Sequence, residues 1–123
     1  MEYFFAVKLD SMVSTMGQLI ILLPTRNEEE GLGEVIERIP EVEIEKMGFT
    51  HRVVVIDGYS TDLTCEIAKE RGAELIHQSG GIGKGNGVRQ AIDSILSEGI
   101  GEGDCLIMLD ADATYFPEEI PKF

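Results

Sequence analysis

The sequence has 123 residues, of which 10 are basic and 23 are acidic, so its formal net charge is −13. A chain of this length makes one domain and can bury a hydrophobic core without disulfides. The acidic balance argues against nucleic-acid binding, because phosphate backbones select basic surfaces, and against an electrostatic membrane anchor. A hydrophobic share of 43% excludes a disordered acidic tail. An acidic protein that binds a diphosphate would need a metal ion to offset the combined charge.

Four short apolar runs predict β-strands. They cover residues 19–23, 53–56, 73–77 and 105–109. Unbroken runs rich in branched side chains are typical of strands that are buried on both faces, as in parallel sheets. No apolar stretch reaches 18 residues, so no transmembrane helix is expected.

Helical periodicity separates these runs. Two sets of apolar residues recur at helical spacing, and each predicts one buried stripe. The sets are Leu32, Val35, Ile36 and Ile39, and then Val88, Ala91, Ile92, Ile95 and Leu96. We expect Asn27 to cap the first helix in a capping box with Glu30, and Pro40 to end it.

Further helices complete the pattern. Residues 62–71 predict a helix that ends at Gly72, and Pro117 suits the first turn of another. The polar connection 41–50 has room for one more helical turn. The resulting order β-α-β-α-β-α-β predicts an α/β fold, a Rossmann-like parallel sheet with alternating helices. In such sheets ligands bind beyond the carboxyl ends of the strands, so the four loops after the strands should share one edge.

Asp110 and Asp112 follow the fourth predicted strand, two residues apart. Carboxylates this close repel each other unless a cation lies between them. Hard oxygen ligands favour Mg²⁺ or Mn²⁺, which commonly bind substrate phosphates as well. The pair therefore predicts a divalent-cation site at this edge of the sheet.

Five glycines surround Lys84 within residues 80–87. Backbone without Cβ atoms can approach a ligand closely, Lys84 offers a positive charge to phosphate, and the following helix N-terminus favours anions. The loop is not a dinucleotide fingerprint, because Asn86 stands at the last glycine position. It is not a P-loop either, because Gly85 follows the lysine and Gln78 stands at the first glycine position.

The remaining chemistry-bearing residues give weaker signals. Cys65 and Cys105 are far apart and have no second Cys or His at metal-ligand spacing, so we expect two buried thiols. His51 and His77 lie in or beside predicted strands and are expected to be packing or surface residues. No nucleophile motif such as G-x-S-x-G is present.

Four segments together resemble the family 2 glycosyltransferases with the GT-A fold, most closely the dolichyl-phosphate mannose/glucose synthase branch. They are PTRNE at 24–28, VVIDGYSTD at 54–62, GKGN at 83–86, and LDAD at 109–112 followed by TYFP at 114–117. The sequence differs from many relatives at Arg26, Gly58–Tyr59, Leu63 and Ala113. These differences concern base preference and loop shape.

The resemblance implies roles for particular residues. The nucleotide-binding set would be Pro24, Thr25, Asn27, Glu28, Asp57, Lys84 and Asp110. Asp57 would meet the base, and Lys84 would lie near the nucleotide. Asp110 and Asp112 would hold Mg²⁺ or Mn²⁺ on the diphosphate. Two other classes of α/β protein fit less well. A receiver-like signalling domain would have an acidic pair after the first strand, and a nucleotidyltransferase would have a glycine-rich segment there. This sequence has neither.

The resemblance also implies an activity. The family transfers a sugar from a nucleotide diphosphate sugar, here a UDP- or GDP-sugar, and this branch uses a polyprenyl or dolichyl phosphate as acceptor. No catalytic residue is assigned, because the family's general base belongs to an acceptor half beyond the D-x-D segment. We therefore expect residues 18–123 to form the donor-binding part of a metal-assisted glycosyltransferase, truncated at its C-terminus. The alternative is a non-catalytic fragment that binds the nucleotide sugar without transferring it.

Three expectations concern the surroundings of this domain. Residues 1–17 are an extension that forms an extra strand or is disordered. If the fourth strand lies at a sheet edge, its open side invites pairing into a homo-oligomer. We expect a cytoplasmic location, with a membrane-peripheral one as the alternative because the implied acceptor is a lipid phosphate.

Overall fold

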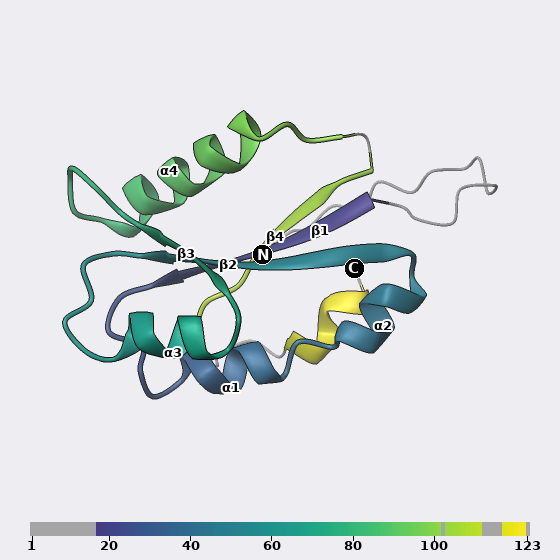
Figure 1. Ribbon diagram of the computed structural model, residues 1–123, viewed down its shortest axis with the longest axis horizontal. Helices are drawn as coiled ribbons and strands as arrows, with labels where there is room; N and C mark the ends of the chain where they lie inside the picture. The colour runs from purple at the N-terminus through teal and green to yellow at the C-terminus, as the bar shows by residue number, and fades with distance from the viewer. Residues whose placement is uncertain (1–16, 102, 112–116, 123) are drawn as a thin grey trace.

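The computed structural model describes residues 17–101, 103–111 and 117–122 (Figure 1). The elements in chain order are β1 (Gly17–Thr25), α1 (Leu32–Glu37), α2 (Glu41–Lys46), β2 (Phe49–Asp57), α3 (Thr64–Glu70), β3 (Glu74–His77), α4 (Lys84–Ser97), β4 (Cys105–Met108) and a 3₁₀ helix (Pro117–Lys122). The expected extension lies outside the described residues up to position 16, and β1 begins at Gly17.

The four strands form one sheet in the order β3-β2-β1-β4, and every neighbouring pair is parallel. β1 lies inside the sheet, with Leu22 in register with Val54 of β2 and with Met108 of β4. The predicted α/β class with a Rossmann-like parallel sheet is confirmed. Because the strands run the same way, their carboxyl ends meet at one edge.

Helices cover both faces of this sheet. Figure 1 shows α4 on one face and α1, α2 and α3 on the other. Alternate residues of β1 enter the two cores: Leu19, Ile21 and Leu23 pack in the cluster that includes α1, whereas Ile20 and Leu22 pack in the cluster that includes α4. Burial on both faces explains the unbroken apolar run of β1, because neither set of side chains meets water.

Some local expectations need correction. Asn27 does not cap α1: the helix begins at Leu32 behind Gly31, and its cap has no side-chain hydrogen bond. Leu96 was expected in the buried stripe of α4 but is 57% exposed, because it lies in the last turn, away from the sheet. Cys105 is buried as expected, whereas Cys65 is only half-buried.

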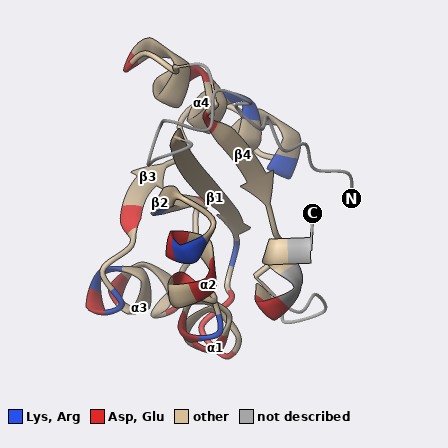
Figure 2. Ribbon diagram, turned by 90° about the vertical axis from the view of Figure 1, so that its right-hand side faces the viewer, with Lys and Arg blue, Asp and Glu red and all other residues tan. Residues whose placement is uncertain are grey.

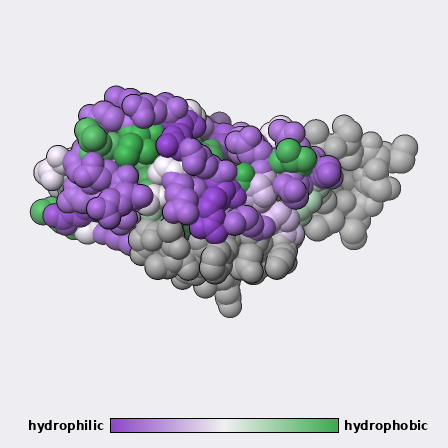
Figure 3. Space-filling model, turned by 90° about the horizontal axis from the view of Figure 1, so that it is seen from below, coloured by the Kyte–Doolittle hydropathy of each residue, from purple (hydrophilic) through white to green (hydrophobic). Residues whose placement is uncertain are grey.

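Charged residues lie mainly on the covering helices, and β1 and β4 carry none (Figure 2). The face covered by α1, α2 and α3 is largely hydrophilic with separate apolar patches (Figure 3). No helix in the described part of the chain is long and apolar enough to cross a bilayer. β4 pairs with β1 on one side only among the described strands, and self-association through its other edge stays a prediction.

Candidate functional site

A pocket of about 260 Å³ lies at the carboxyl edge of the sheet. Residues from the ends of the strands, the loops that follow them and the start of α4 line it. They are Pro24, Thr25, Arg26, Glu28, Ile56, Gly58, Gln78, Gly83, Lys84, Gly87, Asp110 and Ala111. The parallel topology thus brings all four segments that follow the strands to one pocket.

The pocket contains most, but not all, of the expected nucleotide-binding residues. Pro24, Thr25, Glu28, Lys84 and Asp110 line it. Asn27 and Asp57 do not line the pocket. Their hydrogen bonds instead connect the loop after β1 with the loop after β2. Asp112, the second expected metal ligand, lies outside the described residues.

Asp57 ends β2 and is only 3% exposed. Its Oδ1 accepts hydrogen bonds from the Thr25 hydroxyl at 3.1 Å and from the Ser60 hydroxyl at 2.5 Å. Its Oδ2 accepts the Ser60 backbone N–H at 3.0 Å. A buried carboxylate is stable only when such donors replace its hydration. Asp57 therefore joins the end of β1 to the loop after β2.

Asn27 connects the same two loops from the other side. Its backbone N–H donates to the Ser60 hydroxyl at 2.8 Å, and its Oδ1 accepts the Thr61 N–H at 2.8 Å. Its φ of 52° lies in the left-handed region, which asparagine tolerates better than most residues. This conformation, together with the bond to Thr61, explains why Asn27 is not the helix cap that the sequence suggested.

Asp62 and Thr64 fix the start of α3 beside these loops. The Thr64 N–H donates to Asp62 Oδ1 at 3.0 Å, and the Thr64 hydroxyl also donates to that oxygen. Thr64 Oγ1 in turn accepts the Glu28 N–H at 2.9 Å. The hydrogen bond from the Thr64 hydroxyl is the main cause that lowers the pKa of Asp62 below its ordinary value. The loops after β1 and β2 are thus held as one unit.

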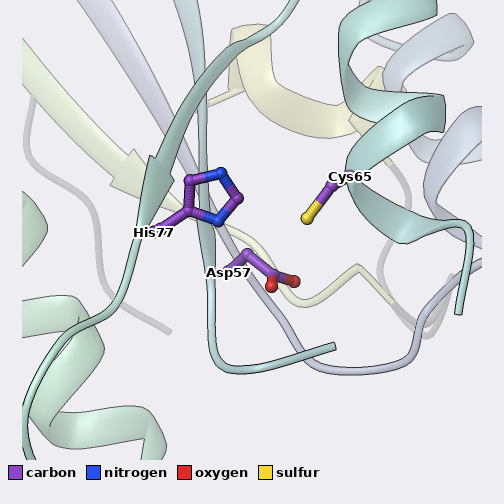
Figure 4. A group of neighbouring side chains, drawn as sticks. All are labelled: Asp57, Cys65 and His77. Carbon is purple, nitrogen blue, oxygen red and sulfur yellow. The ribbon is translucent and has the colours of Figure 1, made fainter. Parts of the chain in front are cut away.

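A second group of side chains lies next to these loops and is formed by Asp57, Cys65 and His77 (Figure 4). The spacing of these residues in the sequence did not predict that they would meet. One ligand atom from each lies within 4.8 Å of the others. Burial, and then the charge of Asp57, raises the pKa of the Cys65 thiol to about 11. The thiol is therefore protonated at neutral pH, whereas metal ligation needs the thiolate. His77 is exposed, which agrees with its expected surface role.

The opposite side of the pocket is the glycine loop and the first turn of α4. The helix begins at Lys84, inside the segment 80–87 that was expected to be a loop, and behind Gly83 with a φ of 125°. The Lys84 ammonium lies 2.5 Å from Asp110 Oδ1, and both side chains are partly exposed. This ion pair joins the start of α4 to the segment after β4.

The donor set at this point suits a divalent cation. Asp110 offers a carboxylate at the pocket, and carboxylate oxygens are the ligands that Mg²⁺ and Mn²⁺ prefer. Among the described residues its cationic neighbour is the Lys84 ammonium, and a bound metal ion would offset the same negative charge. The carboxylate of Asp110, an expected metal ligand, is therefore chemically suited to bind a divalent cation.

Gln78 is a pocket residue that sequence reasoning missed as a site. It follows β3 and is 7% exposed, and its Nε2 donates to the carbonyls of Gly81 at 2.8 Å and Gly83 at 3.0 Å. In the sequence it appeared only as a departure from the P-loop pattern. A polar residue directly after a predicted strand and before a glycine run is the one signal that could have indicated it.

A parallel α/β sheet with a pocket at its carboxyl edge defines the class of open α/β folds, in which ligands bind beyond the ends of the strands. The family model of glycosyl transferase family 2 matches residues 20–123. The chain belongs to this family, which confirms the resemblance found in its sequence.

The chain is similar in sequence to two glycosyltransferases from archaea. The chain is 40% identical over 108 residues to Glycosyltransferase AglJ of Haloferax volcanii, a match covering 88% of this chain and 32% of the relative. It is 32% identical over 102 residues to Dolichol-phosphate mannosyltransferase of Pyrococcus furiosus, covering 83% and 28% respectively. The chain thus spans about a third or less of the length of these relatives.

Solved structures share the fold. Mannosyl-3-phosphoglycerate synthase from Rubrobacter xylanophilus aligns with a TM-score of 0.65 and 26% identity, covering 83% of this chain and 33% of that one. Glucosyl-3-phosphoglycerate synthase from Mycobacterium tuberculosis, crystallised with Mn²⁺ and UDP-glucose, aligns with a TM-score of 0.60 and 24% identity, covering 77% and 33%. These are glycosyltransferases of the GT-A fold.

Proposed function

We propose that this chain binds the nucleotide diphosphate sugar donor of a metal-assisted glycosyltransferase, with UDP or GDP as the nucleotide. The observation that carries the proposal is the contact between Lys84 and Asp110 at the pocket. It places a group suited to phosphate beside a group suited to a divalent cation. A diphosphate bound through a metal ion needs both.

The start of α4 supports a phosphate position. The helix has 14 residues, and its first turn contains Lys84 and no acidic residue. Unpaired backbone N–H groups and the helix dipole favour anions at such an end. In this proposal the Lys84 ammonium binds a phosphate oxygen once a cation has replaced it at Asp110.

The wall opposite α4 supports a nucleoside position. Pro24, Thr25 and Glu28 line this part of the pocket, and the Asp57 and Asn27 networks hold their loops. A volume of about 260 Å³ lies just below the range of roughly 300–1,000 Å³ that is typical for sites that enclose a whole drug-sized ligand. We therefore assign this side of the pocket to the nucleoside part of the donor, and the side with Lys84 and Asp110 to its diphosphate. Asn27 and Asp57 act here by holding the loops.

Asp110 and Asp112 would hold the cation, Mg²⁺ or Mn²⁺. Such an ion, when bound, offsets the negative charge of the diphosphate that leaves in sugar transfer. The M. tuberculosis enzyme of the same fold was crystallised with Mn²⁺ and UDP-glucose, which supports a divalent cation beside the donor.

For the acceptor we propose a polyprenyl or dolichyl phosphate at a membrane surface. The support is the similarity to the enzyme named Dolichol-phosphate mannosyltransferase. Because the chain spans 28% of that relative, we propose this acceptor for the whole enzyme and not for this chain alone.

Calorimetric titration tests the proposal. UDP and GDP are each titrated into the chain with and without Mn²⁺, and the same is done for Asp110→Asn. We expect metal-dependent binding that the variant weakens at least tenfold. Asp93→Asn, an exposed carboxylate on α4 away from the pocket, is the matched control and should bind like the wild type. Binding that ignores Mn²⁺, or an Asp110→Asn variant equal to the wild type, would contradict the proposal.

A transfer assay separates the transferase from a chain that binds the donor alone. Radiolabelled UDP- and GDP-sugars are incubated with the chain, Mn²⁺ and a short polyprenyl phosphate. Sugar transfer supports a chain that is active by itself. Metal-dependent binding without transfer assigns this chain to donor binding only.

A further inference from the structure

The side-chain amide of Gln78 has a fixed orientation in the pocket. Its Nε2 donates to two backbone carbonyls of the glycine loop, those of Gly81 and Gly83. Because carbonyl oxygens only accept hydrogen bonds, the amide nitrogen must face them. The amide oxygen Oε1 therefore faces the other way.

Oε1 lies in a space that two glycines leave open. A Cβ atom on Gly87 would lie 2.5 Å from Oε1, and one on Gly58 would lie 3.0 Å from it. Both glycines, and Gln78 itself, line the pocket. The Gln78 side chain is thus at the pocket wall, and its amide oxygen lies between the loop after β2 and the first turn of α4.

Oε1 has no hydrogen-bond donor among the described residues, although Gln78 is 7% exposed. A buried acceptor without a partner is rare in folded proteins, because the group has lost its water and gained nothing in return. Oε1 can therefore accept a hydrogen bond from a donor group of a ligand bound in the pocket.

We propose that Gln78 selects the nucleobase of the donor by accepting a hydrogen bond from its ring N–H. This inference rests on the proposed nucleotide function. Uracil N3 and guanine N1 each carry a hydrogen, whereas cytosine N3 and adenine N1 are acceptors at the corresponding edge. In this proposal the ring nitrogen, and not the neighbouring exocyclic amine of cytosine or adenine, meets Oε1. An acceptor in that place repels Oε1, so the pocket favours UDP or GDP over CDP and ADP.

Two variants separate base selection from support of the glycine loop. Asn86→Ala removes another hydrogen bond to the Gly81 carbonyl and leaves the Gln78 amide in place. Gln78→Met has a similar length and loses both groups. We expect Gln78→Met to lose a preference of tenfold or more for the favoured nucleotide, and Asn86→Ala to keep most of it. A role in loop support alone would weaken all nucleotides equally in both variants, which would overturn the proposal.

The experiment is calorimetry of UDP, GDP, CDP and ADP with Mn²⁺, after circular dichroism has shown that each variant is folded. The wild-type chain is also titrated with the favoured nucleotide methylated at its ring nitrogen, which keeps the inference testable if Gln78→Met does not fold. We expect the methyl group to weaken binding at least tenfold.

The outcomes distinguish the two claims. Equal affinity of the wild type for all four nucleotides, or for the methylated one, overturns base selection and leaves the proposed function standing. Binding of none of them contradicts the proposed function and base selection together.

Discussion

The two walls of the pocket are held by different chemistry. On the wall formed by the loops after β1 and β2, a buried carboxylate and hydroxyl groups make the connections, with Asp57 and Ser60 at the centre. On the glycine-loop wall, neutral amides of Gln78, Asn86 and Gln90 hold backbone groups of residues 79–83. The Tyr59 hydroxyl joins the two walls through a 2.8 Å bond to the Gly80 carbonyl.

This difference indicates that the two walls have different roles in stability and in ligand binding. Charge-assisted hydrogen bonds are about twice as strong as neutral ones, so the first wall is the more rigid. The second wall consists mostly of backbone without side chains, which can approach and adjust to a ligand. We therefore expect substitutions on the first wall to affect mainly stability, and substitutions that disturb the second wall to affect nucleotide binding as well.

The largest stability loss is expected from Asp57→Asn. The amide turns a donor toward hydroxyl and N–H groups that need an acceptor, and we expect a loss of about 2–3 kcal/mol in the free energy of unfolding. Urea unfolding followed by circular dichroism measures it. Asp93→Asn on the surface of α4 is the control and should stay within about 0.5 kcal/mol of the wild type. A loss of similar size in both variants would show that Asp57 has no special role.

Two glycines in the first turn of α4 test the second wall. A Cβ on Gly87 would collide with the Gln78 amide, whereas one on Gly85 meets nothing within 4 Å. We expect Gly85→Ala to stabilise the chain by about 0.5–1 kcal/mol, because alanine favours helix. Gly87→Ala should instead destabilise it by about 1–2 kcal/mol and weaken nucleotide binding. Thermal unfolding compares the pair, and equal shifts would mean that Gln78 is not held where we describe it.

Asn27 gives a smaller effect on the first wall. Asn27→Ala loses the bond to Thr61 and places alanine at a positive φ, so we expect a loss of about 1–2 kcal/mol. Asn27→Gly loses the same bond but tolerates the backbone conformation, and should lose about 1 kcal/mol less. Chemical unfolding of both variants measures the strain by difference. Identical stabilities would remove backbone strain from the account.

The smallest effect is a pH-dependent one at the opposite end of the sheet. Arg52 of β2 binds Glu74 of β3 and Glu98 just after α4. The hydrogen bond from Arg52 is the main cause that lowers the pKa of Glu74 below its ordinary value. A carboxylate with a lowered pKa stabilises the fold above its unfolded pKa, and this stability is lost as the pH falls through the folded value.

Glu74→Gln tests this contribution. Because half of the Glu74 side chain is exposed, solvent screens the pair, and we expect the variant to be about 0.5 kcal/mol less stable at pH 7. The gap should close as the pH falls below 4.5. Urea unfolding at pH 7, 5 and 3 measures the gap, and a gap that widens toward acid would contradict the assignment.

The sequence was informative where one element alone decides the structure. The apolar run of β1 and the stripes of α1 and α4 reflect burial, and strand order then brings Thr25, Lys84 and Asp110 to one pocket. It failed where distant residues meet. Asn27 resembles a helix cap until its contact with Thr61 is known. The position of the Gln78 side chain depends on two glycines. Gly58 lies 20 residues earlier in the sequence, and Gly87 lies on α4.

The central claim is that a nucleotide binds between the two walls. Nuclear magnetic resonance of the ¹⁵N-labelled chain during titration with UDP or GDP and Mg²⁺ tests it most directly. We predict shifts of the backbone amides of Gly58, Gly83 and Gly87 and of the Gln78 side-chain amide, with α2 unchanged. Replacing Mg²⁺ by Mn²⁺ should broaden the signals nearest Asp110. Shifts centred on α2, or broadening remote from Asp110, would contradict the account.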